Sequence, residues 1–399
     1  MLKRAAVVIV LLGLGLYFFV FRGLYYKPGA FERSGVEHNW FARGFTVALV
    51  WSHSSDSSLA DGANTALDEI NEAKGPLAGK ITLRKFEETP ESIGIGREVA
   101  SHEDVLAVIG HDFESTTMPS SLTYERHGVL FFSTNSSDVR LTGHEFQFVF
   151  RFSFDDTDYM TALTEYAKQK DLVPIGMLFG RADHGELASA QFLAVADELS
   201  VEVPIVRSYF HGSGARAQRE QDFRPLIAEV QKHPFKSLMI ADELPWAAKL
   251  IVDLKRMGVN VPLLSTYKLE SADLEQELTD FGAADAANNL FVASPIDTNA
   301  TTPGYLAFRA RFIRLFGHPP TADAAQAYEA LKLFVRAAEK SGSADPVVVA
   351  TTLKTNKWPG GLFGEVAFHP NGDIIGRRVE IKHFQNGVFT TVGSEKDVE

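Results

Sequence analysis

The stretch "VLAVIGHDFESTTMPSSLTYERHGVLFFSTNSSD", from Val105 to Asp138, decides the fold of this chain. It contains two apolar runs, Val105–Ile109 and Val129–Phe132, each of a length typical of a buried β-strand. Small polar residues follow each run, at Glu114–Thr117 and at Ser133–Ser137. A segment of helical length separates the two runs. This order predicts a βαβ unit, whose two parallel strands end at the same edge of one sheet.

The same alternation of strand and helix extends over most of the chain. Segments of helical spacing separate the apolar runs, which indicates parallel sheets covered on both faces. There are too many such runs for one compact sheet, so we predict two α/β lobes, each a doubly wound parallel sheet. The C-terminal third differs, because three helices are followed by three strands with turns at Asn371-Gly372 and Asn386-Gly387, typical of antiparallel pairing. The expected strands before that third are Thr46–Trp51, Ile81–Phe86, Val105–Ile109, Val129–Phe132, Pro174–Phe179, Val203–Ser208, Ser237–Ala241, Val261–Leu264 and Leu290–Ala293.

Length, charge and cysteine content restrict the possible functions. A chain of 399 residues is too long for one ordinary core, which also favours two domains. The formal net charge of -12 argues against general nucleic-acid binding, which needs a basic surface. The absence of cysteine excludes disulfides, thiol catalysis and cysteine zinc sites.

Residues 1–27 have the pattern of a membrane anchor or a signal segment. Lys3 and Arg4 precede the uncharged segment Ala5–Phe21, which would span about 25 Å as a helix at roughly 1.5 Å per residue. No small-residue cleavage site follows this segment, so we favour an uncleaved anchor over a signal peptide. The basic residues should stay cytoplasmic, which would place the rest of the chain on the periplasmic side of the inner membrane. Cleavage would instead give a soluble periplasmic protein.

The polar clusters after the two quoted strands form a candidate ligand site. In open parallel sheets, ligands bind beyond the carboxyl ends of the strands, where helix N-termini also point. Ser115, Thr116 or Thr117 can cap the following helix or bind a ligand, and Ser136 and Ser137 should lie beside them. Capping and turn formation alone would also explain these residues.

Several segments together make the chain resemble a known family. They are, in order, "TVALVWSHSSDSSLADGANTALDEINEAKGPLAGKITL", "HGVLFFSTNSSDVRLT", "FRFSFDDTD", "ADHGELASAQFLAVADELSV" and "FGEVAFHPNGD". In this order they resemble the type I periplasmic binding proteins, specifically the Leu/Ile/Val-binding branch that serves ABC transporters. The resemblance implies two α/β lobes joined by a hinge that the chain crosses three times. The crossings are expected near Phe150–Phe152, Val292–Pro295 and Leu362–Ala367. The first lobe would hold residues 44–149 and 295–362, and the second would hold 150–294 and 363–393.

The resemblance also implies positions for the ligand-binding residues. In relatives, the turn that corresponds to Glu114-Ser115-Thr116 contacts the ligand carboxylate, and small residues at Ser136 and Ser137 contact the carboxylate and the ammonium. Glu114 departs from the family pattern, which often has Ser at this position.

Other implied positions lie in the second lobe. His184 takes the place of an aromatic residue before Gly. The acidic residue that often binds the ligand ammonium corresponds to Tyr267 and is therefore missing. Asp242 and Glu243 follow another strand and can replace it, and Trp51 ends the first strand and can line the cleft.

The predicted function is binding, not catalysis. The chain lacks the H-E-x-x-H, G-x-S-x-G and P-loop motifs, and no cofactor or metal is expected. We expect an extracytoplasmic protein that captures a small polar ligand, an amino acid or related metabolite, for an ABC permease. Two alternatives remain: a membrane-tethered sensor that uses the same module, and an amidase-like hydrolase.

Overall fold

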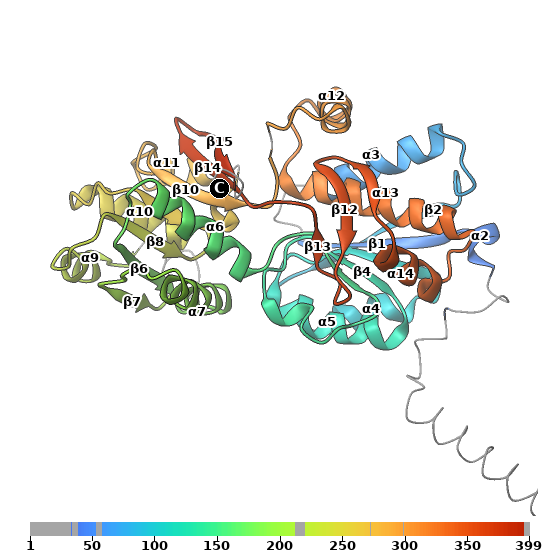
Figure 1. The fold of residues 1–399 in the computed structure, drawn as a ribbon, viewed down its shortest axis with the longest axis horizontal. Coiled ribbons are helices and arrows are strands. Elements are labelled where there is room, and N and C mark those ends of the chain that lie inside the picture. Colours follow the sequence, from blue (N-terminus) through green and yellow to red (C-terminus); the bar gives the residue numbers. More distant parts are fainter. Residues whose placement is uncertain are drawn as a thin grey trace, which may run out of the picture.

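The computed structural model describes residues 33, 39–52, 58–211, 220–271, 273–297 and 299–394. These residues form two lobes, each built around its own sheet (Figure 1). The predicted anchor or signal segment, residues 1–27, lies outside the described residues. Within the described residues, no helix has the length and apolar character needed to cross a membrane.

The first lobe contains a five-stranded sheet in the order β2-β1-β3-β4-β5, and all its strand pairs are parallel. Every residue of β1 and β3 is buried, as expected for strands that helices cover on both faces. One face packs against α3, α12, α13 and α14, and the other packs against α4 and α5. The strands are β1 (Phe45–Ser52), β2 (Ile81–Glu88), β3 (Val105–Gly110), β4 (Leu130–Ser133) and β5 (Val149–Arg151). The helices are α2 (Trp40–Arg43), α3 (Ser58–Glu72), α4 (Ile95–Ser101), α5 (Glu114–His127), α12 (Pro303–Phe316), α13 (Ala322–Ser341) and α14 (Pro346–Thr355), with the 3₁₀ turn η1 (Val139–Leu141).

The second lobe contains a seven-stranded sheet in the order β15-β14-β10-β9-β8-β6-β7. The five strands from β10 to β7 are parallel, and the β14–β15 hairpin adds two antiparallel strands at one edge. Helices α6 and α7 cover one face, and α9, α10 and α11 cover the other. The strands are β6 (Ile175–Gly180), β7 (Val206–Tyr209), β8 (Ser237–Ala241), β9 (Leu263–Ser265), β10 (Leu290–Ser294), β14 (Glu380–Gln385) and β15 (Val388–Ser394). The helices are α6 (Asp156–Gln169), α7 (Asp183–Glu198), α9 (Arg224–Val230), α10 (Trp246–Arg256) and α11 (Asp273–Asp280), with the 3₁₀ turn η2 (Tyr267–Leu269).

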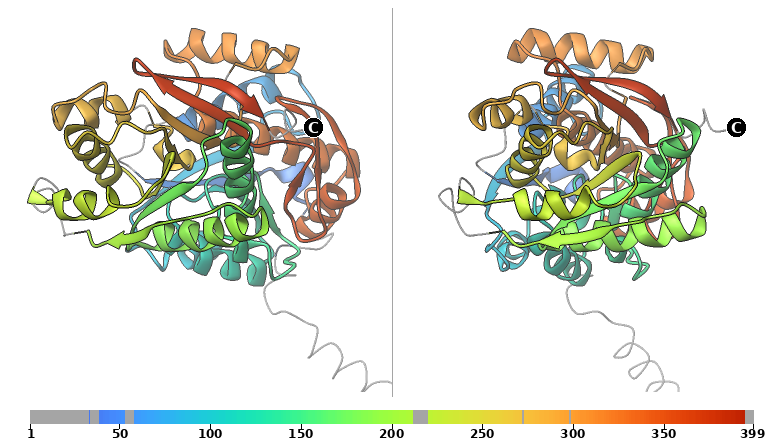
Figure 2. Two further views of the ribbon diagram at one scale, coloured as in Figure 1. Left: turned by 60° about the vertical axis from the view of Figure 1, so that its left-hand side comes forward. Right: turned by 90° about the vertical axis from the view of Figure 1, so that its left-hand side faces the viewer.

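A small third sheet belongs to the first lobe. It comprises β11 (Trp358–Gly361), β12 (Gly364–Phe368) and β13 (Ile374–Ile375), and Val366, Phe368 and Ile374 pack into the first lobe's core. Figure 2 shows α12 and the β14–β15 hairpin along the same outer side of the molecule.

The chain passes between the lobes after β5, after β10 and after β13. The last passage, at residues 376–379, lies later than the crossing expected at Leu362–Ala367. The expectation was wrong because it ended the first lobe at residue 362, whereas residues 363–375 contribute apolar side chains to that lobe's core.

The predicted strand and helix pattern is confirmed, with a few omissions. Each expected strand overlaps an observed one, and the three C-terminal helices lie where they were predicted. The prediction lacked α2, β5, α6, β11 and β13 and the two 3₁₀ turns. Strands β5, β11 and β13 are only two to four residues long, too short to produce a recognisable period.

The quoted stretch forms β3, α5 and β4, as predicted, and α5 ends where Gly128 adopts a φ of 66°. Parallel pairing places the carboxyl ends of β1, β3 and β4 at one edge of the first sheet, and those of β6, β8 and β9 at one edge of the second. These two edges face the same space between the lobes.

Candidate functional site

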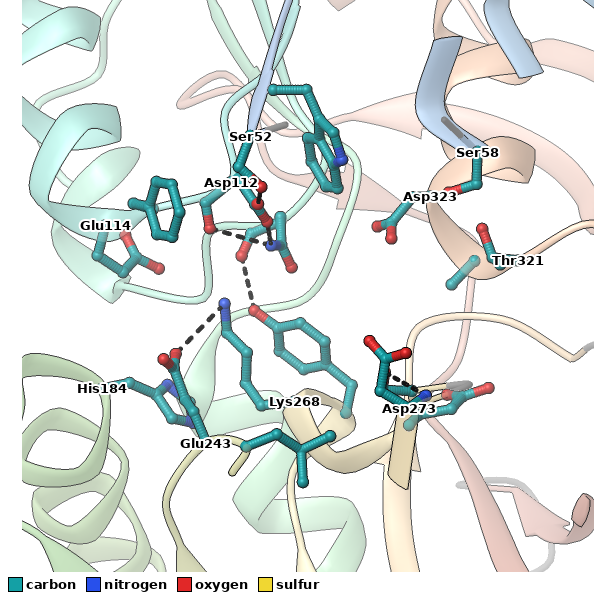
Figure 3. Close-up of a pocket in the computed structure, with 18 of the residues that line it drawn as sticks. Ser52, Ser58, Asp112, Glu114, His184, Glu243, Lys268, Asp273, Thr321 and Asp323 are labelled. Carbon is teal, nitrogen blue, oxygen red and sulfur yellow. Dashed lines mark hydrogen bonds and ion pairs between the residues drawn. The ribbon is translucent and has the colours of Figure 1, made fainter. Parts of the chain in front are cut away.

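A cavity of about 710 Å³ lies between the two lobes. Its walls come from segments that follow β1–β4 in the first lobe and β6, β8 and β9 in the second, together with the N-terminal turn of α13 (Figure 3). Polar residues dominate the lining, with several aromatic and apolar side chains among them. The lining residues are Trp51, Ser52, Ser58, Pro90, Asp112, Phe113, Glu114, Ser115, Asn135, Ala182, His184, Glu243, Leu244, Tyr267, Lys268, Glu270, Ser271, Asp273, Pro295, Thr321, Ala322, Asp323 and Gln326.

A buried network holds the turn after β3 in place. His111 Nδ1 lies 2.7 Å from Glu88 Oε2 and its Nε2 lies 2.9 Å from the Tyr124 hydroxyl, and the side chains of His111 and Glu88 are fully buried. The other oxygen of Glu88 accepts a hydrogen bond of 2.6 Å from the backbone N–H of Asp112. Burial raises the pKa of Glu88, but the bonds from His111 and Asp112 outweigh burial and hold it below its usual range. The buried carboxylate of Glu88 therefore holds the backbone of Asp112 in position beside the cavity.

Glu114 is the first residue of α5, and its carboxylate turns towards the β4 end. It accepts a hydrogen bond of 2.7 Å from the Ser136 hydroxyl and one of 3.0 Å from the backbone N–H of Ser137. Burial raises the pKa of Glu114, while Lys268 and the Ser136 hydroxyl act against this shift. The carboxylate of Glu114 therefore accepts the hydrogen bonds that the Ser136 hydroxyl and the Ser137 backbone N–H donate at the end of β4.

The second lobe contributes an ammonium group to the cavity. Lys268 Nζ lies 3.7 Å from Glu243 Oε1, and the side chain of Lys268 is 11% exposed. Burial lowers the pKa of Lys268, but Tyr267, Glu243 and Glu114 more than compensate, so the net shift is upward. Burial lowers the pKa of His184 to about 4, so its imidazole is neutral at pH 7.

A direct hydrogen bond joins the lobes across this space. The hydroxyl of Tyr267, in the second lobe, donates to the backbone carbonyl of Asn135, in the first, at 2.6 Å. The bond links the segment after β9 to the segment after β4.

On the α13 side of the cavity, buried acceptors lack donors. Glu270 has one oxygen bonded to Lys382, but its Oε2 has no hydrogen-bond partner among the described residues. Gln326 is 1% exposed, and its Oε1 likewise has no partner within the described part of the chain. Burial raises the pKa of Asp323 to about 7, and the negative charges of Asp112 and Glu270 add to this shift.

The structure places six of the predicted site residues at the cavity and four elsewhere. Ser136 and Ser137 lie behind Glu114 and do not line the cavity. The Ser136 hydroxyl and the Ser137 backbone N–H both donate to the Glu114 carboxylate. Asp242 is buried and accepts hydrogen bonds from the hydroxyl of Tyr209 and from His211 Nε2, so it does not reach the cavity. The predicted residues that line it are Trp51, Glu114, Ser115, His184, Glu243 and Tyr267.

Capping of α5 by Ser115, Thr116 or Thr117, one of the two roles considered for these hydroxyls, does not occur. The helix begins at Glu114, after Phe113, and no side chain caps it. The hydroxyls of Thr116 and Thr117 instead donate to the carbonyl of Phe113, and that of Ser115 donates to Pro90. The pattern of several hydroxyls did not indicate which residue would start the helix.

Sequence reasoning missed several charged residues of the site. Lys268 directly follows the predicted Tyr267, and its charge beside a predicted ligand position was an available indication. Asp323 follows Thr321, the N-cap of α13, whose hydroxyl accepts from the backbone N–H of Ala324. Nothing local in the sequence indicates that this helix start reaches a cavity whose other walls come from residues 51–295.

Among the described residues, no group of three or more His, Asp or Glu side chains is arranged to hold a metal ion.

Residues 51–380 match the family model described as periplasmic binding protein.

The chain belongs to the periplasmic binding protein family. The resemblance found in the sequence and the predicted two-lobed fold are therefore confirmed.

Relatives of known name agree with this assignment. The Leu/Ile/Val-binding protein homolog 1 of Brucella abortus is 24% identical over 322 residues, which cover 79% of this chain and 82% of that protein. The leucine-, isoleucine-, valine-, threonine- and alanine-binding protein of Pseudomonas aeruginosa is 22% identical over 317 residues, covering 78% and 81% of the two chains.

Solved structures show the same architecture. An ABC transporter substrate-binding protein from Desulfitobacterium hafniense is 25% identical, with a TM-score of 0.74 over 88% of this chain and all 100% of that one. A leucine-binding protein from Thermotoga maritima is 20% identical, with a TM-score of 0.76 over 88% and 99% of the two chains.

Proposed function

We propose that this protein is the ligand-binding component of an ABC-type transporter and captures a small polar solute between its lobes. The observation that carries this proposal is the cavity of about 710 Å³, which is lined by the carboxyl ends of strands from both sheets. A volume of this size fits a small-molecule site. Its named relatives bind amino acids, which supports a ligand of metabolite size.

Binding would be coupled to movement of the lobes about the three connecting segments. A ligand stabilises the closed arrangement only by the contacts that it makes better there than in the open one. Groups from both lobes reach the cavity, including Asp112 and Glu114 from the first and Glu243 and Lys268 from the second (Figure 3). The solute would be released unchanged to a membrane permease.

A thermal-shift screen of the full chain tests the proposed function. The panel contains amino acids, amides, polyamines and aromatic acids, with mass spectrometry of the recovered ligand. A true ligand at a hundredfold excess over its dissociation constant should stabilise the protein by about 2.7 kcal/mol. It should also be recovered intact. No stabilisation by any compound, or conversion of the ligand into product, would contradict the proposal.

A pair of variants locates the binding. Ala322 lines the cavity, so Ala322→Trp should fill part of it and abolish the stabilisation. Ala73 is exposed at the end of α3, and Ala73→Trp should leave the stabilisation unchanged. Equal effects of the two variants would place the ligand outside the cavity.

We also propose that Ala5–Phe21 anchors the protein to the inner membrane with residues 28–399 on the periplasmic side. The basic lead, the uncharged segment and the lack of a cleavage site support this proposal. Fractionation of cells that express the full chain should recover it in the membrane fraction with an intact N-terminus. A soluble periplasmic form that begins after Phe21 would show cleavage instead.

A further inference from the structure

Two of the donors that the family resemblance assigns to a ligand carboxylate are already in use, whereas the hydroxyl of Ser137 has no partner among the described residues. Ser136 Oγ and the backbone N–H of Ser137 both donate to the carboxylate of Glu114, at 2.7 and 3.0 Å. A ligand carboxylate would have to displace Glu114 or lie against it, and two carboxylates in one site repel each other. The protein therefore supplies its own carboxyl group where relatives place that of the ligand.

The remaining charges around the cavity are mostly negative. Among the described lining residues, six carboxyl groups face a single lysine ammonium, and His184 is neutral at pH 7. The ammonium of Lys268 is already paired with Glu243 at 3.7 Å. The six carboxyl groups are those of Asp112, Glu114, Glu243, Glu270, Asp273 and Asp323.

Two buried acceptors on the α13 side match a donor-bearing ligand, while the buried indole N–H of Trp51, which also lines the cavity, has no acceptor among the described residues. Glu270 Oε2 accepts no hydrogen bond within the described residues, although Lys382 holds the other oxygen. Gln326 is 1% exposed, and its Oε1 is also unpartnered in the described part of the chain. Buried acceptors without donors are costly, so a ligand with N–H groups would relieve both.

We propose that the cleft binds a small organic cation without a carboxylate, an aliphatic amine or diamine, with an ammonium group beside Asp323 and Glu270. The inference rests on the proposed function and specifies its ligand. Trp51, Phe113 and Tyr267 also line the cavity, and aromatic faces attract alkylammonium groups.

Three probes of matched shape test the assignment by isothermal titration calorimetry on the full chain at pH 8. They are leucine, 3-methylbutylamine, which is leucine without its carboxylate, and 4-methylpentanoate, which is leucine without its ammonium. Putrescine and cadaverine extend the series to diamines. The amine or a diamine should bind at least about tenfold more tightly than leucine, and 4-methylpentanoate should not bind.

Two variants with matched controls locate the groups responsible. Asp323→Asn should weaken amine binding by at least about tenfold, because it removes one half-buried carboxylate partner of the cation. Asp197→Asn, at an exposed position of α7, should leave it unchanged. Glu114→Ser should free the Ser136 and Ser137 donors and increase leucine affinity by about tenfold, whereas Glu198→Ser, also exposed, should not. Thermal melts of each variant verify that it is folded.

The outcomes separate the inference from the function on which it rests. Leucine or 4-methylpentanoate binding at least as tightly as the amines would overturn the inference and leave the proposed function intact. Amine binding that Asp323→Asn does not weaken would also overturn it. Absence of binding by every amine would refute the inference. The proposed function is contradicted as well only if no compound of the thermal-shift panel stabilises the protein.

Discussion

The two sides of the cavity differ in how their charged groups are satisfied. On the paired side, Asp112, Glu114, Lys268 and Glu243 have hydrogen-bond or ion-pair partners within the protein. On the open side, which comprises Glu270, Asp323 and Gln326, two buried acceptors have no donor among the described residues. Figure 3 shows Glu114, Glu243 and Lys268 at one side of the cavity and Asp323 at the other.

This difference separates structural groups from ligand-binding groups. The paired side is fixed before any ligand arrives, because the buried His111–Glu88 pair and the Ser136 and Ser137 donors hold it. The open side keeps unpaired acceptors that a ligand can satisfy. Four predictions test this division, starting with the largest effect.

Breaking the buried pair behind the paired side should cost the most stability. Glu88→Gln removes the carboxylate that lies beside His111 and accepts from the backbone N–H of Asp112, and each hydrogen bond to a charged group contributes about 1.5–3 kcal/mol. Urea denaturation at pH 7 measures the loss. Glu91→Gln, at a nearby exposed position, is the control and should change little. A loss below about 1 kcal/mol for Glu88→Gln would show that the turn does not depend on this pair.

Asp156 should make stability depend on pH. Burial raises its pKa to about 7, and the negative charge of Glu114 adds to the shift. The folded state therefore binds this proton more tightly than the unfolded state, and stability falls as pH rises from about 4 to about 7. Asp156→Asn does not titrate, so it should be more stable than the wild type at pH 8, by on the order of 2 kcal/mol, and similar at pH 5. Thermal melts at the two pH values test this, and a difference that does not change with pH would disprove it.

Ligand binding on the open side should weaken in acid. Asp323, which faces Asp112, Glu270 and Lys268, has a pKa of about 7 because of its burial, so it is largely protonated at pH 5.5. The alkylamine keeps its charge over this range. Its affinity should fall about tenfold between pH 8 and pH 5.5 in calorimetry, and less in Asp323→Asn. An equal fall in the variant would assign the effect to another group.

Removing the bond between the lobes should have the smallest effect. Tyr267→Phe deletes the hydroxyl that donates to Asn135, and a single neutral hydrogen bond contributes about 1 kcal/mol. The open arrangement should become more populated, which small-angle X-ray scattering detects as a larger radius of gyration. Tyr305→Phe, in the first-lobe core, provides a control for loss of a buried hydroxyl. An unchanged radius in Tyr267→Phe would mean that other contacts hold the lobes together.

The fold was largely predictable because its elements are long and periodic. Strands such as β1 and β3 are buried along their whole length, and this gives continuous apolar runs that stand out in the sequence. The third crossing was misplaced because β11–β13 are short and belong to the lobe that precedes them in the chain.

The site was less predictable because its residues meet only through the tertiary fold. The ends of strands identified Trp51 and Glu114, since parallel strands place their carboxyl ends together, and the family resemblance identified Tyr267. Asp323 and Gln326 come from the start of a C-terminal helix, which no strand-end rule indicates. The side-chain direction of Glu114, towards Ser136 and Ser137, also depends on packing that a sequence does not encode locally.

A crystal structure of the full chain with 3-methylbutylamine would show where the cation binds and what Glu114 contacts in the complex. We predict the amine between the lobes, with its nitrogen about 2.7–3.2 Å from a carboxylate oxygen of Asp323 or Glu270, and Glu114 still bonded to Ser136 and Ser137. An amine bound outside the cavity, or one whose nitrogen contacts neither carboxylate, would contradict the account.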